Sequence, residues 1–144
     1  MNFKIINLQT FDNPKGPVSH GLKKSDIDFK GFGEAYFSEI YQGQIKGWKR
    51  HYKMIMNIIV PVGNVTFYLI EISSEKQFRI TLGEKKLKRL FIPPEYWVAF
   101  EGIAKKNIIL NLASIEHDPD EQKNVDLNHF NLVKKNFENI DVGM

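Results

Sequence analysis

The densest group of side chains that could carry chemistry lies between residues 43 and 53, in the run GQIKGWKRHYK. If residues 49–53 are extended, Lys49 and His51 point to one face, because successive side chains of a strand alternate. In a cavity, an imidazole could remove a proton next to a ketone while a neighbouring ammonium stabilises the enolate oxygen. We therefore predict His51 as a base and Lys49 as its electrostatic partner. Alternatively, both belong to a solvated strand edge together with Lys46 and Arg50.

Other candidate site residues are more scattered. His117 lies in SIEHDPDEQ, whose acidic side chains could orient it, although such a run is also typical of a solvated turn. Tyr96 and Trp97 could stack on a base or sugar ring, or pack in the core. Asn57 is the polar residue in the otherwise apolar run MIMNIIVPVG, and we expect it to contact a bound molecule.

The spacing of apolar runs indicates an all-β domain. Short alternating or apolar segments separated by Gly, Pro, Asn and Asp dominate residues 34–115, and helical periodicity is nearly absent. This pattern is typical of an antiparallel sandwich or barrel. We predict strands near 3–8, 34–41, 45–52, 55–62, 65–72, 77–82, 88–92, 96–100 and 107–114.

Glycine and proline positions predict the connections. Gly63 and Asn64 should close a hairpin between the strands at 55–62 and 65–72. Residues 12–33 are rich in Gly, Lys, Asp and Pro, and should form an irregular loop or arm. Residues 119–144 turn polar, so we expect a lightly packed tail. All 144 residues are assigned to one domain, with its core at about 34–115.

Composition narrows the possible functions. The chain has no cysteine, which excludes disulfides and thiolate sites and favours a reducing cytoplasm. Its net charge of +3 comes from scattered lysines rather than the dense basic stripe that nucleic-acid binding needs. No apolar run approaches the length of a membrane span, so we expect a soluble protein.

The order of four motifs resembles a known family. GQIKGWKRH at 43–51 is followed by VPVGNV, then FIPPEYWVAF, then LASIEHDPDE. This order is similar to that of the cupins that act as dTDP-4-keto-6-deoxyglucose 3,5-epimerases and WxcM-like sugar 3,4-ketoisomerases. The first motif reads G-x-[IL]-R-G-L-H in the epimerases and R-G-x-H-A-H in the ketoisomerases. The resemblance implies a single antiparallel jelly-roll β-barrel and a homodimer.

Some residues of this sequence match the site residues of the family, and others replace them. Lys46 matches an arginine that contacts phosphate or sugar, and His51 matches the second ketoisomerase histidine. Lys49 replaces the epimerase base and the first ketoisomerase histidine. Val98 replaces a second pocket histidine, and Leu110 or a neighbour replaces the tyrosine that acts as the opposing acid. Cupin metal ligands, two histidines followed by a glutamate and a later histidine, have no match in spacing, so no metal is expected.

These matches and replacements lead to three hypotheses about the function. The first is an isomerase or epimerase that moves a proton next to the keto group of a 4-keto sugar nucleotide for surface polysaccharides, without a cofactor. In it His51 is the base, Lys49 holds the enediolate, Lys46 and Arg50 lie near the diphosphate, and aromatic residues hold the base or sugar. The second is a non-catalytic cupin that binds a sugar or nucleotide sugar. The third is a generic interaction domain, which would leave Lys49 and His51 on the outer face.

Overall fold

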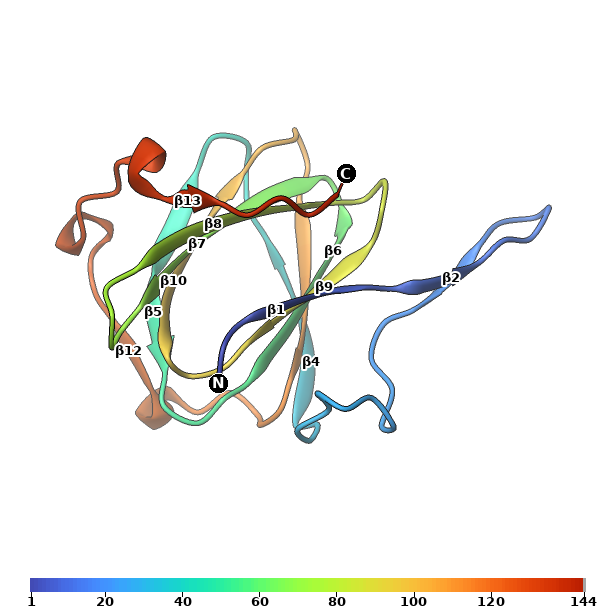
Figure 1. Ribbon diagram of the computed structural model, residues 1–144, viewed down its shortest axis with the longest axis horizontal. Helices are drawn as coiled ribbons and strands as arrows, with labels where there is room; N and C mark the ends of the chain where they lie inside the picture. Colours follow the sequence, from blue (N-terminus) through green and yellow to red (C-terminus); the bar gives the residue numbers. More distant parts are fainter. Residues whose placement is uncertain (144) are drawn as a thin grey trace.

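Two β-sheets face each other in the computed structural model, which describes residues 1–143 (Figure 1). One sheet has five strands in the order β1-β9-β6-β11-β4, and the other has six in the order β12-β5-β10-β7-β8-β13. A separate ribbon pairs β2 with β3. All pairings between these strands are antiparallel, except that β13 runs parallel to β8. The all-β barrel predicted from the sequence is confirmed.

The nine predicted strands are all present, with bounds within two residues of those expected. They are β1 (Lys4–Asn7), β4 (Glu34–Glu39), β5 (Ile45–His51), β6 (Met56–Val62), β7 (Asn64–Glu71), β8 (Gln77–Gly83), β9 (Lys88–Ile92), β10 (Tyr96–Gly102) and β11 (Ile108–Ala113). Four short strands were not predicted: β2 (Gln9–Phe11), β3 (Val18–His20), β12 (Gln122–Asn124) and β13 (Glu138–Asn139). Three single-turn 3-10 helices cover Pro119–Glu121, Leu127–His129 and Lys134–Asn136.

The predicted hairpin at Gly63 is wrong, because β6 and β7 belong to different sheets. Gly63 has φ +83°, and a Cβ there would lie 2.2 Å from the carbonyl oxygen of Lys106. Beyond it, the backbone N–H of Asn64 donates to Oδ1 of Asn107 (3.0 Å). This tight contact with the 104–107 turn carries the chain from one sheet to the other. The antiparallel partner of β7 is instead the following strand, β8.

The main core lies between the two sheets. Its members are apolar side chains that point inward from both sheets: Ile40, Ile58, Val60, Val65, Phe67, Leu69, Ile80, Leu82, Leu90, Ile92, Tyr96, Val98 and Ile109. Because β6 and β7 are each covered on both faces, they read as continuous apolar runs in the sequence. In the part of the chain that the structure describes, no helix has the length and apolar character needed to span a membrane.

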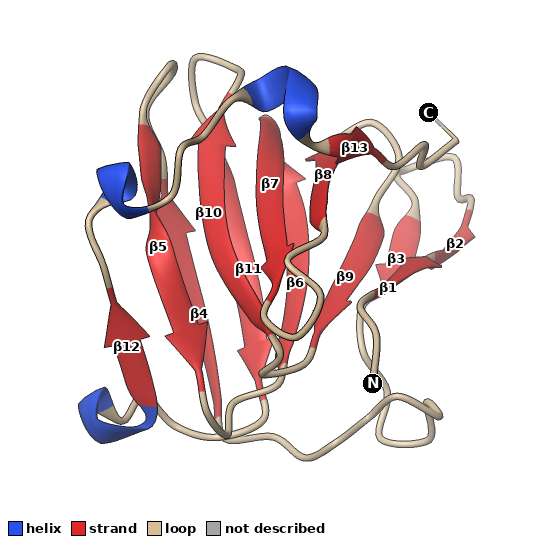
Figure 2. Cartoon of the chain, turned by 60° about the vertical axis from the view of Figure 1, so that its left-hand side comes forward, coloured by secondary structure: helices blue, strands red, loops and turns tan. Residues whose placement is uncertain are grey.

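The C-terminal segment is packed against the outer face of the six-stranded sheet, contrary to the predicted light packing (Figure 2). Phe137 is buried, with its ring stacked at 6.4 Å from Trp48 and edge-on at 5.2 Å to Tyr68. The indole N–H of Trp48 donates to the carbonyl of Leu127 (3.1 Å). A second small core therefore covers the back of β5, the strand that carries the predicted site.

Replacing Phe137 with alanine should lower the free energy of unfolding by about 3–5 kcal/mol, because it leaves a cavity between Trp48 and Tyr68. Urea unfolding followed by tryptophan fluorescence measures this loss. Lys135→Ala, an exposed change on the same segment, should stay within about 0.5 kcal/mol of the wild-type value. Equal stability of the two variants would contradict the role assigned to the segment.

Candidate active site

A cavity of about 390 Å³ opens between the two sheets. Both polar and apolar residues line it, and they come from seven strands. They are Tyr36, Ser38, Lys46, Gly47, Trp48, Lys49, His51, Met56, Ile58, Phe67, Val98, Phe100, Ile109, Asn111 and Asn124. Lys49 and His51 both line it, as the alternation along 49–53 predicts. Lys49 and His51 therefore do not lie on the outer face, where the interaction-domain hypothesis would leave them. His51 is also buried, which the interpretation as a solvated strand edge did not expect.

An irregularity in β5 adds Lys46 to the same cavity. Strict alternation would point Lys46 away from Lys49, which is three residues later. The pairing of β5 with β10 instead shifts register, so that Lys49 lies opposite Val98 and Lys46 opposite Phe100. The extra residue of this bulge is accommodated at Gly47, where a Cβ would lie 2.4 Å from the Cβ of Ala99. Lys46 then lines the cavity, with its ammonium donating to the carbonyl of Glu39 (2.6 Å).

His51 forms a buried pair with Glu121. Nδ1 of the imidazole hydrogen-bonds Oε1 of Glu121, and each residue is only 3% exposed. The other carboxylate oxygen accepts backbone N–H groups of Tyr52 (3.2 Å), Lys53 (3.1 Å) and Met54 (3.1 Å). Since Glu121 occupies Nδ1, Nε2 is the ring nitrogen left for the cavity. The carboxylate thus orients the imidazole and selects its tautomer.

The environment keeps His51 neutral and Glu121 ionised at neutral pH. Burial lowers the pKa of His51 below 6.5, and this outweighs the hydrogen bond and charge of Glu121, which raise it. For Glu121, burial raises the pKa, but the hydrogen bonds from His51 and from the N–H groups of Lys53 and Met54 outweigh it, so the pKa is lowered from 4.5. A neutral imidazole with Nε2 free has the form that a general base requires.

Tyr36 enters the cavity from the opposite sheet. It lies on β4, where Tyr36 and Ser38 point inward, and its hydroxyl accepts a hydrogen bond from Nδ2 of Asn111 (2.8 Å). Burial raises its pKa above 10, although the bond from Asn111 lowers it, so the phenol stays protonated at neutral pH. It could donate a proton from the wall opposite His51.

Only part of the predicted substrate-binding set reaches the cavity. Lys46 does, but Arg50 faces the other side of the sheet, with its guanidinium 4.3 Å from the ring centre of Tyr52. Asn57 is buried on the outer face of the five-stranded sheet, where its Oδ1 accepts from Arg89 (2.5 Å). The orientations of Arg50 and Asn57 both follow from strand alternation once the inward face is known.

The aromatic predictions and His117 also lie away from the cavity lining. Tyr96 points into the barrel but packs against Phe3, and its hydroxyl donates to Glu71 (3.3 Å). Trp97 lies on the outer face, where its ring centre is 5.4 Å from that of Phe130. His117 is exposed in the loop before β12, where its backbone N–H donates to Glu34 (2.9 Å).

The sequence prediction missed Tyr36, Asn111 and Glu121. Alternation along EAYFSE at 34–39 carried a usable signal for Tyr36, because it places the tyrosine and Ser38 on one face. Glu121 carried none, since it belongs to an acidic run that is typical of a solvated turn. The tyrosine that the resemblance expects was matched to Leu110 or a neighbour; of these, the neighbour Asn111 lines the cavity, and Tyr36 supplies a phenol from the adjacent strand.

A model of the family described as "FdtA: WxcM-like, C-terminal" matches residues 1–135. The chain belongs to this family. No curated relative matches it. Across residues 1–143, no three His, Asp or Glu side chains come together as a ligand set for a metal ion, and the absence of a metal stays a prediction.

Solved structures with the same architecture include three sugar-nucleotide enzymes. A dTDP sugar isomerase from Desulfovibrio desulfuricans G20 is 28% identical with TM-score 0.82, covering 88% of this chain and 85% of that one. A histidine-to-asparagine mutant of the 3,4-ketoisomerase QdtA from Thermoanaerobacterium thermosaccharolyticum, in complex with TDP-4-keto-6-deoxyglucose, is 21% identical (TM-score 0.74, coverage 85% and 86%). The epimerase RmlC from Legionella pneumophila is 14% identical (TM-score 0.79, coverage 88% and 73%). The last two show the shared cupin fold.

The buried pair predicts acid sensitivity. The folded state holds His51 with a lowered pKa, so the unfolded chain binds more protons once the pH falls below about 6.5, and stability decreases. The lowered pKa of Glu121 adds a further loss below about 4.5. Urea unfolding at pH 7.5 and 5.5 measures the first step, and His51→Asn serves as control. If His51→Asn lost as much stability between pH 7.5 and 5.5 as the wild type, the loss would belong to other titrating groups.

Proposed function

We propose that this protein catalyses proton transfer next to the keto group of a 4-keto sugar nucleotide, as an isomerase or epimerase. The observation that carries the proposal is the neutral His51, oriented by Glu121 and facing a cavity that also contains Lys49 and Tyr36. Enolisation needs a base and a group that stabilises the enolate oxygen, and a phenol can return a proton afterwards.

His51 is the base in the proposed reaction. Nε2 removes the proton from the carbon next to the ketone, and the electron pair of that C–H bond becomes the new carbon–carbon double bond as the carbonyl oxygen takes the negative charge. The Nδ1–H donates to Glu121, which stabilises the imidazolium that forms. The ammonium of Lys49 stabilises the enolate oxygen within the same cavity.

The return of the proton decides the product. If His51 gives its proton to the former carbonyl carbon, while the hydroxyl proton moves between the two oxygens, the keto group shifts to the neighbouring carbon. If Tyr36 donates a proton to the original carbon from the opposite face, that carbon is inverted. The position of Tyr36 on the sheet opposite His51 is compatible with the second route.

The cavity suits a sugar ring better than a whole nucleotide. Its volume of about 390 Å³ lies at the lower end of ordinary ligand pockets. Its walls at Met56, Ile58 and Phe67 are apolar, and Lys46 is the cation we assign to the diphosphate in place of Arg50. The solved QdtA structures hold TDP-4-keto-6-deoxyglucose in one case and TDP in the other, which supports a sugar nucleotide as ligand. We also propose a cytoplasmic location and a role in surface polysaccharide biosynthesis, which the motif resemblance supports.

Incubation with 4-keto sugar nucleotides in deuterated water should exchange the hydrogen next to the ketone, and proton NMR identifies the carbon. His51→Ala should slow exchange by roughly 10²–10⁴-fold, because the base is lost. Lys49→Met should also slow it, through the loss of charge at the enolate oxygen.

Arg50→Met is the matched control for Lys49→Met, because Arg50 is the adjacent cation but faces away from the cavity. Its exchange rate should equal that of the wild type. Binding without exchange would favour the non-catalytic alternative, which the replacement of two epimerase histidines by Lys49 and Val98 keeps open. Exchange that survives His51→Ala would remove His51 from its assigned role.

The Tyr36→Phe variant distinguishes epimerisation from the keto shift. It removes the hydroxyl and keeps the ring, so an epimerase should lose net turnover while exchange by His51 continues. A ketoisomerase that uses His51 alone should keep most of its turnover. Chromatography of the product sugars, run beside the exchange assay, measures both quantities. Loss of exchange and turnover together would instead assign Tyr36 to the first proton transfer.

A further inference from the structure

A row of polar side chains crosses the five-stranded sheet, one from each of four neighbouring strands. Arg89 lies on β9, Asn57 on β6, Asn111 on β11 and Tyr36 on β4. The first three are each no more than 3% exposed. Polar groups cost free energy when they are buried, and apolar side chains would pack the same positions without that cost. The row therefore calls for a role beyond packing.

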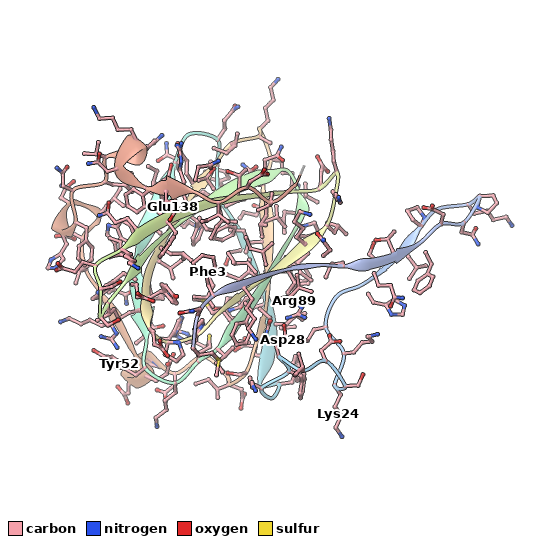
Figure 3. All side chains as sticks on the ribbon, viewed as in Figure 1. Phe3, Lys24, Asp28, Tyr52, Arg89 and Glu138 are labelled. Carbon is pink, nitrogen blue, oxygen red and sulfur yellow. The ribbon has the colours of Figure 1, made fainter. Side chains whose placement is uncertain are left out.

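The outer end of this row is held by an ion pair. The guanidinium of Arg89 donates to Oδ1 of Asp28 (3.0 Å), which lies beside it in Figure 3, and to the carbonyl of Gly21 (3.0 Å). It also donates to Oδ1 of Asn57 (2.5 Å). A buried pair of this kind is costly to break from one side, so Asn57 has a fixed place in β6.

The amide of Asn111 joins this outer end to the cavity. The backbone N–H of Asn57 donates to Oδ1 of Asn111 (3.1 Å). Because a backbone N–H can only donate, the amide oxygen must face β6, and Nδ2 is the atom turned the other way. Nδ2 donates to the hydroxyl oxygen of Tyr36 (2.8 Å). The two bonds together determine which way the amide points.

This orientation leaves the hydroxyl proton of Tyr36 for the cavity. Since the phenol oxygen accepts from Asn111, its own proton needs another acceptor. Among the residues that the structure describes, the remaining partner of the hydroxyl is the sulfur of Met54, at 3.9 Å, and a thioether accepts only weakly. A molecule in the cavity can therefore take this proton, and the phenolate that remains keeps the N–H of Asn111 as a donor.

We infer that Asn111 is a positioning residue for Tyr36, an assignment that rests on the proposed function, in which Tyr36 returns a proton. The amide aims the hydroxyl proton into the cavity and stabilises the phenolate after proton transfer. Burial and the charges of Glu34 and Glu121 raise the pKa of Tyr36, and the bond from Asn111 acts against them. Asn57 acts through Asn111 and does not itself touch the ligand.

The pKa of Tyr36 tests this role without any substrate, so the outcome is independent of the proposed function. Asn111→Leu keeps the shape of the side chain and removes its N–H groups. The pKa of the phenol should rise by about 1 or more, because the phenolate loses a hydrogen bond to its charge. The charged and titratable groups around the phenol stay in place: Glu34, Glu121, His51, Lys46 and Lys49.

Fluorine NMR of protein labelled with ring-fluorinated tyrosine measures this pKa, since fluorine lowers the pKa of a phenol toward neutral pH. The resonance of Tyr36 is the one that is missing in Tyr36→Phe, and Tyr41, which is 75% exposed, is an internal reference. Asn124→Leu is the matched control, because Asn124 also lines the cavity but comes from β12 in the other sheet. It should leave the pKa of Tyr36 unchanged.

A double-mutant cycle tests whether Asn111 acts through Tyr36. Asn111→Leu should change net turnover in the same direction as Tyr36→Phe, while exchange by His51 continues. In the Tyr36→Phe background it should add nothing, because the hydroxyl that it positions is gone. A residue with a purely structural role would keep its effect there, and that result would overturn the proposal. If no sugar nucleotide exchanges at all, the proposed function fails, and the pKa measurement still decides the role of Asn111.

Asn111→Asp is the second variant, because leucine leaves the N–H of Asn57 without an acceptor. Aspartate keeps this acceptor and the shape of the side chain, but its carboxylate cannot donate to a phenolate, so the pKa of Tyr36 should rise here too. Circular dichroism verifies that each variant folds. A pKa of Tyr36 that stays at the wild-type value in the folded variants would contradict the assigned role, as would an equal rise in Asn124→Leu.

Discussion

The hydrogen bond between His51 and Glu121 joins residues 70 positions apart, and the arrangement of the site depends on it. It forms because β12 pairs with β5, which sets Gln122 opposite His51 and brings the preceding Glu121 within hydrogen-bond reach of Nδ1. The same carboxylate accepts the backbone N–H groups that follow β5, so it also ends the strand. One buried charge thus holds the imidazole of His51, its tautomer and the local backbone together.

Strand β5 places different functions on its two faces. Its inner side lines the cavity, and its outer side carries Trp48, which the C-terminal segment covers through Phe137 and the carbonyl of Leu127. The bulge at Gly47 breaks the strict alternation, so that lysines three residues apart share the inner face. The cations of the site are therefore positioned by packing on the opposite side of the sheet.

The two sheets divide the proposed chemistry between them. His51 and the lysines come from the six-stranded sheet, whereas Tyr36 and Asn111 come from the five-stranded sheet. A ring bound between the sheets would have a base on one face and a phenol on the other. In the proposed reaction, this division leaves both a keto shift and an inversion open, and the protonation step would decide between them.

The sequence by itself determined the nine longer strands, the barrel and the family, because alternation and turn residues are local properties of the chain. It also determined that Lys49 and His51 share a face, since the period of a strand is two. Only the tertiary structure decided the rest. Lys46 joined the site through a bulge at Gly47, which packs closely against Ala99, and Asn57 lies on the outer face, where it accepts a hydrogen bond from Arg89. Glu121 became the partner of His51 because a long-range strand pairing removed it from water, and no local pattern encodes that pairing.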